Sequence, residues 1–347
     1  MITKTEKIDL TGIGRDEICS ILSEFGMKPF RGEQIFQWIH KHSEISFERM
    51  TNLSKRDREI LNQRTQILVP ALADRYYASD GTEKFLYRLT DGHTIEGVLI
   101  PDEKRLTLCV STQVGCAMGC TFCLTGQGGL VRNLTASEIV GQILLIRRML
   151  PDRPLTHIVF MGMGEPLANY ENTVQAVRIL LDPMGADFSK RKITLSTCGL
   201  IPGIQRFAKE KIGINLAVSI NASDSSSRDR IMPINRTYPL EDLLKVLRDY
   251  PLPVRNRITL EYVLIHGMND SLEDAKRLTR ILRGIRCKIN LIPYNPVQGS
   301  GFVPPPRSQM QAFQDILLQS RFTVMIRESR GQEISAACGQ LRERACS

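Results

Sequence analysis

The spacing of apolar residues changes along the chain and divides it into three segments. From residue 83 the period is two, and Asp91-Gly92 separates two alternating runs, which predicts a β-hairpin over residues 85–100. Before that point apolar side chains recur at helical spacing, which predicts helices over residues 15–25, 32–42 and 54–68. We therefore expect a small N-terminal helical domain over residues 1–75 and a short β-hairpin extension over residues 76–105.

From residue 106 onward, short apolar runs alternate with amphipathic stretches. The pattern predicts strands near residues 106, 157, 192, 214, 258, 287 and 322, and helices near residues 135, 170, 202, 240, 272 and 308. Such alternation implies a parallel sheet, because each helix returns the chain to start the next strand in the same direction. Six units of this kind predict an α/β fold, a partial (β/α)6 barrel over residues 106–347, with its functional residues on the loops that follow the strands.

The loop after the first of these strands carries three cysteines, Cys116, Cys120 and Cys123, among several glycines. Three thiolates are one fewer than the four ligands of a closed zinc site or of an ordinary four-iron cluster. One interpretation is a [4Fe-4S] cluster whose open iron binds the amino and carboxylate groups of S-adenosylmethionine (SAM). The alternative is a structural zinc ion with Cys109 or His93 as the fourth ligand.

Composition and charge narrow the class of protein. The net charge is +9 and the pI is near 9.1, which favours a polyanionic partner, although an ordinary solvated surface explains the charge equally well. The start of the chain lacks the apolar core of a signal peptide, and no apolar run reaches membrane-spanning length. We expect a cytoplasmic protein without membrane association, whose nine cysteines serve thiol or metal chemistry rather than a disulfide scaffold.

A glycine-rich segment, Gly162-Met-Gly-Glu165, follows the second strand of the predicted barrel. It is not a dinucleotide fingerprint, because Leu167 stands where that motif needs its third glycine. The segment is either an ordinary turn or a backbone edge and carboxylate that bind an ammonium group.

Three residues outside the cysteine loop are candidates for chemistry. Cys338 follows the last predicted strand, so it is either a packed thiol or a nucleophile at the barrel mouth. Glu96 and Cys109 are symmetric about a turn centred between residues 102 and 103, which would make them cross-strand neighbours in a closed hairpin. Glu96 is then either a surface residue or a partly buried base, and Cys109 is by default a buried strand cysteine.

These motifs occur in the order found in a known family. From Phe30-Arg-Gly-Glu-Gln-Ile-Phe36 to Ala337-Cys-Gly-Gln-Leu341 the chain resembles the radical SAM methyltransferases that act on RNA adenosine, the RlmN/Cfr family. The resemblance implies that Cys116, Cys120 and Cys123 bind one [4Fe-4S] cluster with an open iron. The positions that match SAM contacts are Gly164, Glu165, Ser196, Ser219, Ile220, Asn221 and Asn295. The family's usual Ser-Leu-His is here Ser-Ile-Asn, and Asn cannot carry a charge.

The resemblance also implies the reaction. Cys338 matches the cysteine that is methylated and carries the carbon to the substrate, Glu96 matches the general base, and Cys109 matches the partner thiol that forms a disulfide with Cys338. The implied activity is methylation of C2 of an adenosine in 23S rRNA and of one in tRNA. The implied partners are these RNAs and an external, flavodoxin-like electron donor, with the chain a monomer and its helical domain an accessory RNA-binding module. The alternatives are methylation at C8 of adenosine, and a non-catalytic RNA-binding protein stabilised by zinc.

Overall fold

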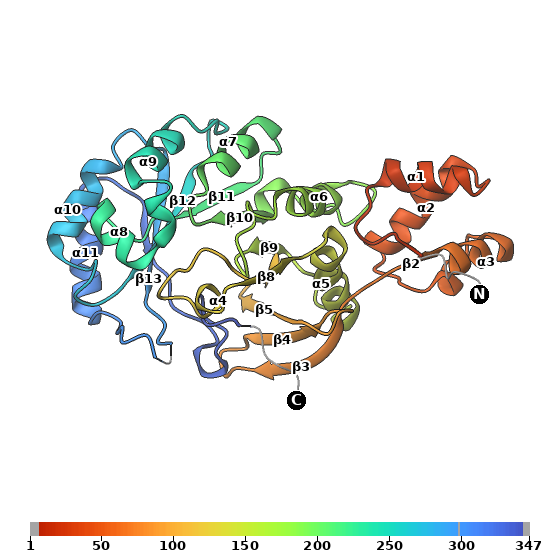
Figure 1. Ribbon diagram of the computed structural model, residues 1–347, viewed down its shortest axis with the longest axis horizontal. Coiled ribbons are helices and arrows are strands. Elements are labelled where there is room, and N and C mark those ends of the chain that lie inside the picture. Colours follow the sequence, from red (N-terminus) through yellow and green to blue (C-terminus); the bar gives the residue numbers. More distant parts are fainter. Residues whose placement is uncertain (1–6, 298, 343–347) are drawn as a thin grey trace.

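The computed structural model describes residues 7–297 and 299–342. Its core is a ten-stranded sheet in the order β14-β13-β12-β11-β10-β9-β6-β5-β4-β3 (Figure 1). The strands are β3 (Ala71–Tyr77), β4 (Glu83–Arg88), β5 (Thr94–Asp102), β6 (Arg105–Cys109), β9 (His157–Phe160), β10 (Ile193–Thr197), β11 (Asn215–Ser219), β12 (Ile258–Leu264), β13 (Cys287–Pro293) and β14 (Val324–Ile326). The seven strands from β6 to β14 are parallel, and β3 to β6 are antiparallel.

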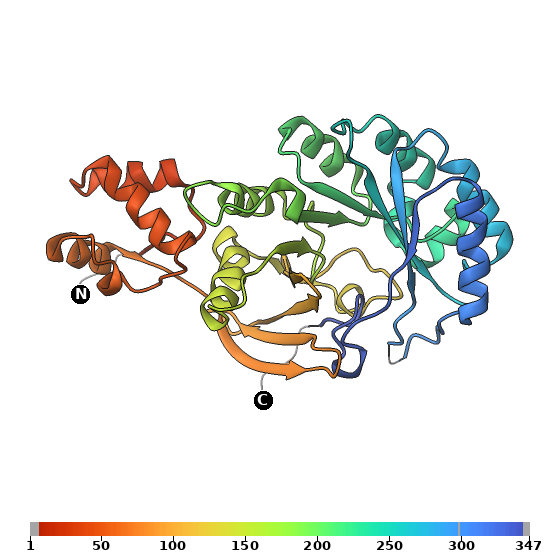
Figure 2. The same ribbon diagram turned by 180° about the vertical axis from the view of Figure 1, so that it is seen from behind.

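Helices cover the outer face of the curved parallel strands (Figures 1 and 2). They are α5 (Ala136–Met149), α6 (Tyr170–Leu181), α7 (Ile201–Glu210), α8 (Ser225–Ile231), α9 (Leu240–Arg248), α10 (Leu272–Ile281) and α11 (Arg307–Gln319). All but the short α8 coincide with predicted helices, and each predicted strand is present. Because β14 and β3 end the sheet, the barrel is open, and the predicted partial (β/α)6 barrel is confirmed. No helix within the described ranges has the length and apolar character needed to cross a bilayer.

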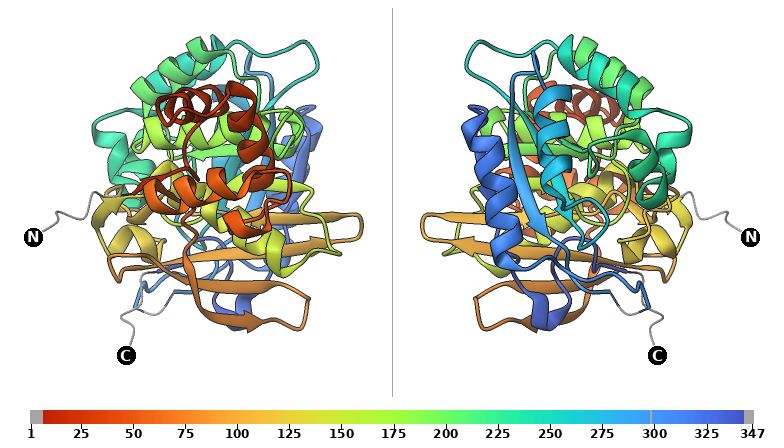
Figure 3. Two further views of the ribbon diagram at one scale, coloured as in Figure 1. Left: turned by 90° about the vertical axis from the view of Figure 1, so that its right-hand side faces the viewer. Right: turned by 90° about the vertical axis from the view of Figure 1, so that its left-hand side faces the viewer.

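The N-terminal block lies at one end of the molecule, nearest the viewer in the left panel of Figure 3. It consists of α1 (Arg15–Glu24), α2 (Pro29–His40), α3 (Lys55–Arg64) and a two-stranded parallel sheet of β1 (Ile8–Asp9) and β2 (Thr65–Gln66). The third helix ends four residues earlier than predicted, because buried Thr65 pairs with Ile8 as a strand. The strand β3 already begins at Ala71, so the domain boundary at residue 75 stays a prediction.

The predicted hairpin is present, but its second turn is shifted. Asp102 pairs with Arg105, so the turn consists of Glu103 and Lys104, and Cys109 lies opposite Val98. The prediction that Cys109 lies opposite Glu96 is therefore wrong, because the centre of the turn lies one residue later than assumed. Since Glu96 and Val98 are two residues apart on one strand, Glu96 still shares a sheet face with Cys109.

Candidate functional site

Two short strands pair with each other at the base of the cysteine loop. β7 (Gln113–Gly115) pairs in an antiparallel sense with β8 (Leu130–Asn133), and the cysteines lie between them, followed by the short α4 (Leu124–Gln127). Gly115 has φ +75°, and a Cβ there would lie 2.0 Å from the Gly129 carbonyl oxygen. The Cys116 amide donates to the same oxygen over 2.7 Å. Where β7 pairs with β8, position 115 therefore has room only for glycine.

The three cysteine side chains lie in an environment that disfavours free thiolates. Burial raises the pKa of Cys116 to about 12, and it raises the pKa of Cys120 and of Cys123 as well. Thiols of this kind stay protonated unless a metal holds the thiolate. Within residues 7–297 and 299–342, no three His, Cys, Asp or Glu side chains are arranged around a single ion. Each ligand of a four-iron cluster bonds a different iron atom, so three thiols that do not surround a single ion fit such a cluster.

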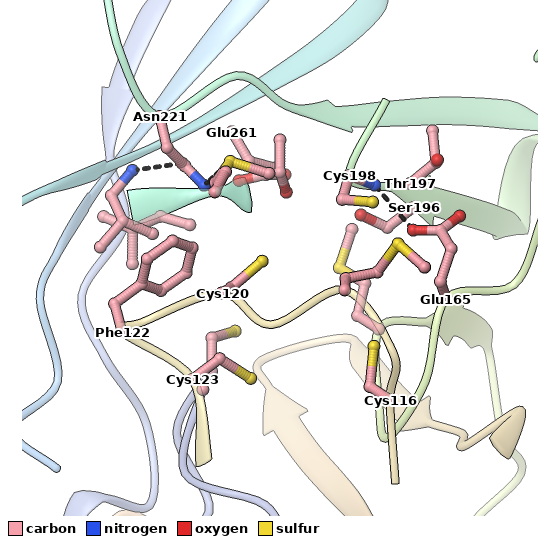
Figure 4. A pocket seen from close by; sticks show the side chains of 18 of the residues that line it. Cys116, Cys120, Phe122, Cys123, Glu165, Ser196, Thr197, Cys198, Asn221 and Glu261 are labelled. Atoms are coloured by element: carbon pink, nitrogen blue, oxygen red, sulfur yellow. Dashed lines mark hydrogen bonds between the residues drawn. The ribbon is translucent and has the colours of Figure 1, made fainter. Parts of the chain in front are cut away.

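One pocket brings most of the predicted site residues together, with the cysteines facing Glu165, Cys198 and Asn221 across it (Figure 4). The predicted residues that line it are Cys116, Cys120, Cys123, Gly164, Glu165, Ser196, Ser219, Asn221, Asn295 and Cys338. They come from the carboxyl ends of strands, as Ser196 and Ser219 do, or from the loops that follow the strands, at the edge of the parallel sheet where barrels of this class place their functional residues. Ile220, Cys109 and Glu96 do not line the pocket.

The backbone holds the Glu165 carboxylate in a fixed position. Its two oxygens accept hydrogen bonds from the Leu167 amide (3.1 Å) and the Cys198 amide (2.8 Å). Burial raises the pKa of Glu165, and these hydrogen bonds oppose that shift. Gly164, with φ +100°, brings the chain so close to Gln113 that a Cβ would lie 2.6 Å from that side chain. The segment presents a rigid carboxylate and a bare backbone edge to the pocket, as binding of an ammonium group requires.

The two residues after Ser219 face opposite ways. Asn221 has φ +53°, a left-handed conformation in which Asn is favoured over most residues. Its side-chain oxygen accepts the Val263 amide over 2.8 Å, so the side chain links β11 to β12 at the edge of the pocket. Ile220 is fully buried in the hydrophobic core, and its contact with SAM stays a prediction.

The loop that carries Cys338 folds back over the barrel mouth and contacts the cysteine loop. Cys338 is exposed, and its carbonyl oxygen accepts a hydrogen bond from Asn295 over 3.0 Å. The Leu124 amide, directly after Cys123, donates to the Gly339 oxygen over 2.8 Å. Cys338 is therefore not a packed thiol, and its role as a nucleophile stays a prediction.

Cys109 and Glu96 lie on β6 and β5, outside the pocket lining. Burial raises the pKa of Cys109 to about 12, and the nearby Cys338 shifts it in the same direction. Glu96 is fully buried and forms an ion pair with Lys84 at 3.2 Å. The implied disulfide between Cys109 and Cys338 is not supported, because all the described cysteines are free, and Cys346 lies outside the described residues.

The pocket residues that were not predicted from the sequence include Cys198, Glu261 and Arg327. Glu261 stands inside the otherwise apolar strand β12 beside Ser219, and its buried carboxyl accepts a hydrogen bond from Asn290 over 3.0 Å. A charged residue within a buried parallel strand was the available signal.

Comparison with known proteins agrees with this geometry. Residues 8–67 match the model of the ribosomal RNA large subunit methyltransferase N-terminal domain, and residues 110–279 match that of the radical SAM superfamily. A dual-specificity RNA methyltransferase RlmN from Pelobacter propionicus is 49% identical over 97% of this chain and 96% of its own length. Another from Geotalea uraniireducens is 50% identical over 98% of both chains.

A solved structure gives the same result for the fold. The crystal structure of a radical SAM methyltransferase from Sphaerobacter thermophilus superposes with a TM-score of 0.93 at 43% identity, covering 96% of this chain and 99% of that one. Both the N-terminal block and the barrel are included in this match. The chain therefore belongs to the RlmN family of dual-specificity RNA methyltransferases, within the radical SAM superfamily.

Proposed function

We propose that this protein methylates C2 of an adenosine in 23S rRNA and of an adenosine in tRNA, with SAM as the source of the carbon. The observation that carries the proposal is the single pocket lined by three cysteine thiols, the Glu165 carboxylate and Cys338. The curated relatives are named RNA methyltransferases of dual specificity, and the match covers nearly the whole chain.

The low reactivity of adenine C2 explains why methylation at this carbon needs such a pocket. C2 is an electron-poor carbon that bears only hydrogen, so it cannot attack a methyl sulfonium as an amine or a thiolate would. A carrier thiol and a radical that activates the carried methyl group overcome this difficulty. The arrangement of an exposed cysteine beside three less accessible cysteines supports that route.

The residues of the pocket fit the cofactors that the family uses. Cys116, Cys120 and Cys123 would hold one [4Fe-4S] cluster, leaving one iron for the amino and carboxylate groups of SAM. Glu165 and the backbone at Gly164 would bind the SAM ammonium group. The further proposed SAM contacts are Ser196, Ser219, Ile220, Asn221 and Asn295. When bound, the cluster and SAM supply the 5′-deoxyadenosyl radical.

The chain's own residues have separate roles in this proposal. The Cys338 thiolate takes up a methyl group, and the activated carbon becomes bonded to the substrate ring while still attached to the Cys338 sulfur. Glu96 removes the ring proton, and the adduct gives up its unpaired electron to the external electron carrier. The Cys109 thiolate then attacks the Cys338 sulfur, so that a transient S–S bond forms as the S–C bond breaks, and the released carbon takes up a proton to become the methyl group of the product.

Two further assignments come with the proposal. The N-terminal helical block is an accessory RNA-binding module, in line with its match to a ribosomal RNA methyltransferase domain. The electron that SAM cleavage needs comes from an external donor of the flavodoxin type. We expect the chain to act as a monomer in the cytoplasm.

An anaerobic assay tests the proposal. The protein is reconstituted with iron and sulfide and incubated with SAM, a reductant and either a 23S rRNA fragment or tRNA, and the nucleosides are then analysed by mass spectrometry. We expect 2-methyladenosine from both RNAs. Formation of 8-methyladenosine would show that the regiochemistry is wrong, and a zinc-containing protein without iron would refute the enzyme interpretation.

A further inference from the structure

An arginine side chain is fully buried behind the wall of the pocket. Arg228 lies on α8, and it is the largest of the side chains that are completely shielded from solvent. Arginine is almost never buried in this way, because its charge loses hydration. A buried guanidinium group is retained where its donors find acceptors, so the acceptors of Arg228 indicate what it does.

The guanidinium group of Arg228 joins the ends of two strands to α8. Its Nη2 donates to the Cys198 carbonyl oxygen over 2.6 Å and to the Ser219 oxygen over 3.3 Å, and its Nε donates to the Ile220 oxygen over 3.0 Å. Its Nη1 donates to the side-chain oxygen of Asn235 over 3.0 Å. Because Cys198 follows β10 and Ser219 ends β11, one side chain fixes two neighbouring strand ends.

Both strand ends belong to the part of the pocket that is proposed to bind SAM. Ser219 lines the pocket, and the Cys198 amide donates to the Glu165 carboxylate over 2.8 Å (Figure 4). Glu165 is the residue proposed to bind the SAM ammonium group. Cys198 is therefore bonded to Arg228 through its carbonyl group and to Glu165 through its amide, so the position of the carboxylate depends on Arg228.

The helix that carries Arg228 also contacts the cysteine loop. The Thr121 amide, directly after Cys120, donates to the Ile231 oxygen at the end of α8 over 3.0 Å. Burial raises the pKa of Cys120, and the charge of Arg228 opposes that shift. Burial lowers the pKa of Arg228, and the thiolate forms of Cys198 and Cys120 have the largest opposing effects. The positive charge therefore lies close to a proposed cluster ligand.

We propose that Arg228 is a positioning residue for SAM, which holds Cys198 and Ser219 in place and whose charge stabilises the reduced form of the cluster. The inference rests on the proposed function, in which Cys120 is one of three cluster ligands and Glu165 binds SAM. A cluster that gains an electron becomes more negative, so a nearby cation raises its reduction potential. Arginine keeps its positive charge at any pH at which the protein is folded.

The first experiment measures SAM binding by the reconstituted protein in equilibrium dialysis. Arg228→Met removes both the hydrogen bonds and the charge, whereas Arg228→Lys keeps the charge but has no planar fork to bond both strand ends at once. We expect both variants to bind SAM about tenfold more weakly, the usual effect of losing about one hydrogen bond. An affinity of R228M equal to that of the wild type overturns the proposal.

A matched control comes from α5. Arg147 also donates to backbone carbonyls, those of His40 and Lys41, over 2.5 and 2.8 Å, but these carbonyls belong to the N-terminal block. Arg147→Met therefore removes a guanidinium group of the same kind without touching β10 or β11, and we expect the SAM affinity of the wild type. Equal weakening in R147M and R228M contradicts a specific role for Arg228.

The second experiment measures the reduction potential of the cluster in a titration followed by electron paramagnetic resonance, without RNA. We expect a more negative potential in R228M and the wild-type potential in R228K, because lysine retains the charge. Equal potentials in R228M and the wild type, or equal shifts in R228M and R228K, overturn the inference. Should R228M fail to fold, Arg228→Gln replaces it, since glutamine is neutral yet still donates hydrogen bonds.

The third experiment needs no cofactor. Hydrogen exchange of the metal-free proteins is measured over residues 196–200 and 219–222, where R228M is expected to exchange faster than the wild type and R147M is not. Unchanged exchange in R228M overturns the positioning role. A wild type that makes no methyladenosine, with the Arg228 variants altered as expected, refutes the proposed function alone.

Discussion

The most quantitative prediction concerns His40, the last residue of α2, where the N-terminal block meets the barrel. The side chain is 1% exposed and lies against Phe36, with ring centroids 4.5 Å apart. Arg147 on α5 donates to the His40 carbonyl oxygen over 2.5 Å. Burial lowers the pKa of His40 to about 3, and the Arg147 charge shifts it in the same direction. The imidazole is therefore neutral in the folded protein.

The sign and size of the effect follow from proton linkage. An unfolded histidine has a pKa of about 6.5, so below that pH only the unfolded chain takes up the proton. The stabilisation is complete above about pH 6.5 and is lost as the pH falls towards 3. Between pH 7.5 and pH 5 the loss is about 2 kcal/mol, since the slope approaches about 1.36 kcal/mol per pH unit below pH 6.5. That is a large share of the 5–15 kcal/mol that is typical of a folded domain.

The single tryptophan makes the effect measurable in this block alone. Trp38 lies on α2, two residues before His40, so its fluorescence reports unfolding of the N-terminal helices. Guanidinium unfolding is followed at pH 7.5, 6 and 5 for the wild type, His40→Leu and the exposed-residue control His42→Leu. We expect H40L to lose about 2 kcal/mol less than the other two between pH 7.5 and 5. Equal losses in all three proteins would refute the reasoning.

Three further predictions concern the pocket. Cys338→Ala is expected to abolish RNA methylation while leaving iron and sulfide content unchanged; loss of iron would show that this cysteine belongs to the metal site instead. Gly115→Ala places a Cβ 2.0 Å from the Gly129 oxygen and is expected to lower iron content and melting temperature, unlike Gly92→Ala, which has a positive φ (+90°) but no atom within 4 Å. Gly164→Ala is expected to weaken SAM binding in equilibrium dialysis by about tenfold, or about 1.4 kcal/mol, because the Gln113 side chain must move; unchanged affinity would contradict a role for this backbone edge.

Local patterns were enough to predict the parallel strands, their helices and the cysteine loop. Each of these features depends on neighbours in sequence: the apolar run of β12, the spacing from Cys116 to Cys123, and the capping box of Thr135 and Glu138 that starts α5. The rim of the barrel could also be predicted, because parallel strands bring their following loops to the same edge.

The sequence could not predict the register of neighbouring strands or the side-chain contacts between them. The register of β5 and β6 depends on which residues form the turn between them. Glu103 has a positive φ in this turn, and with Glu103 and Lys104 as the turn residues Cys109 lies opposite Val98 instead of Glu96. The ion pair of Lys84 with Glu96 depends on the pairing of β4 with β5. Likewise Arg327 reaches the pocket only because β14 completes the sheet beside β13.

The cysteines differ in burial, and this difference matches the different roles proposed for them. Among the described cysteines, Cys338, the proposed methyl carrier, is the exposed one, whereas burial raises the pKa values of the three proposed cluster ligands and of Cys109. Arg327 lines the pocket with Cys338, and its charge lowers the pKa of Cys109, opposing the effect of burial. In the proposed mechanism the buried Cys109 has to meet Cys338, which lines the pocket together with Arg327. Attack of one thiol on the other therefore requires that the loop carrying Cys338 stays over the barrel mouth, where the Leu124 amide donates to the Gly339 oxygen.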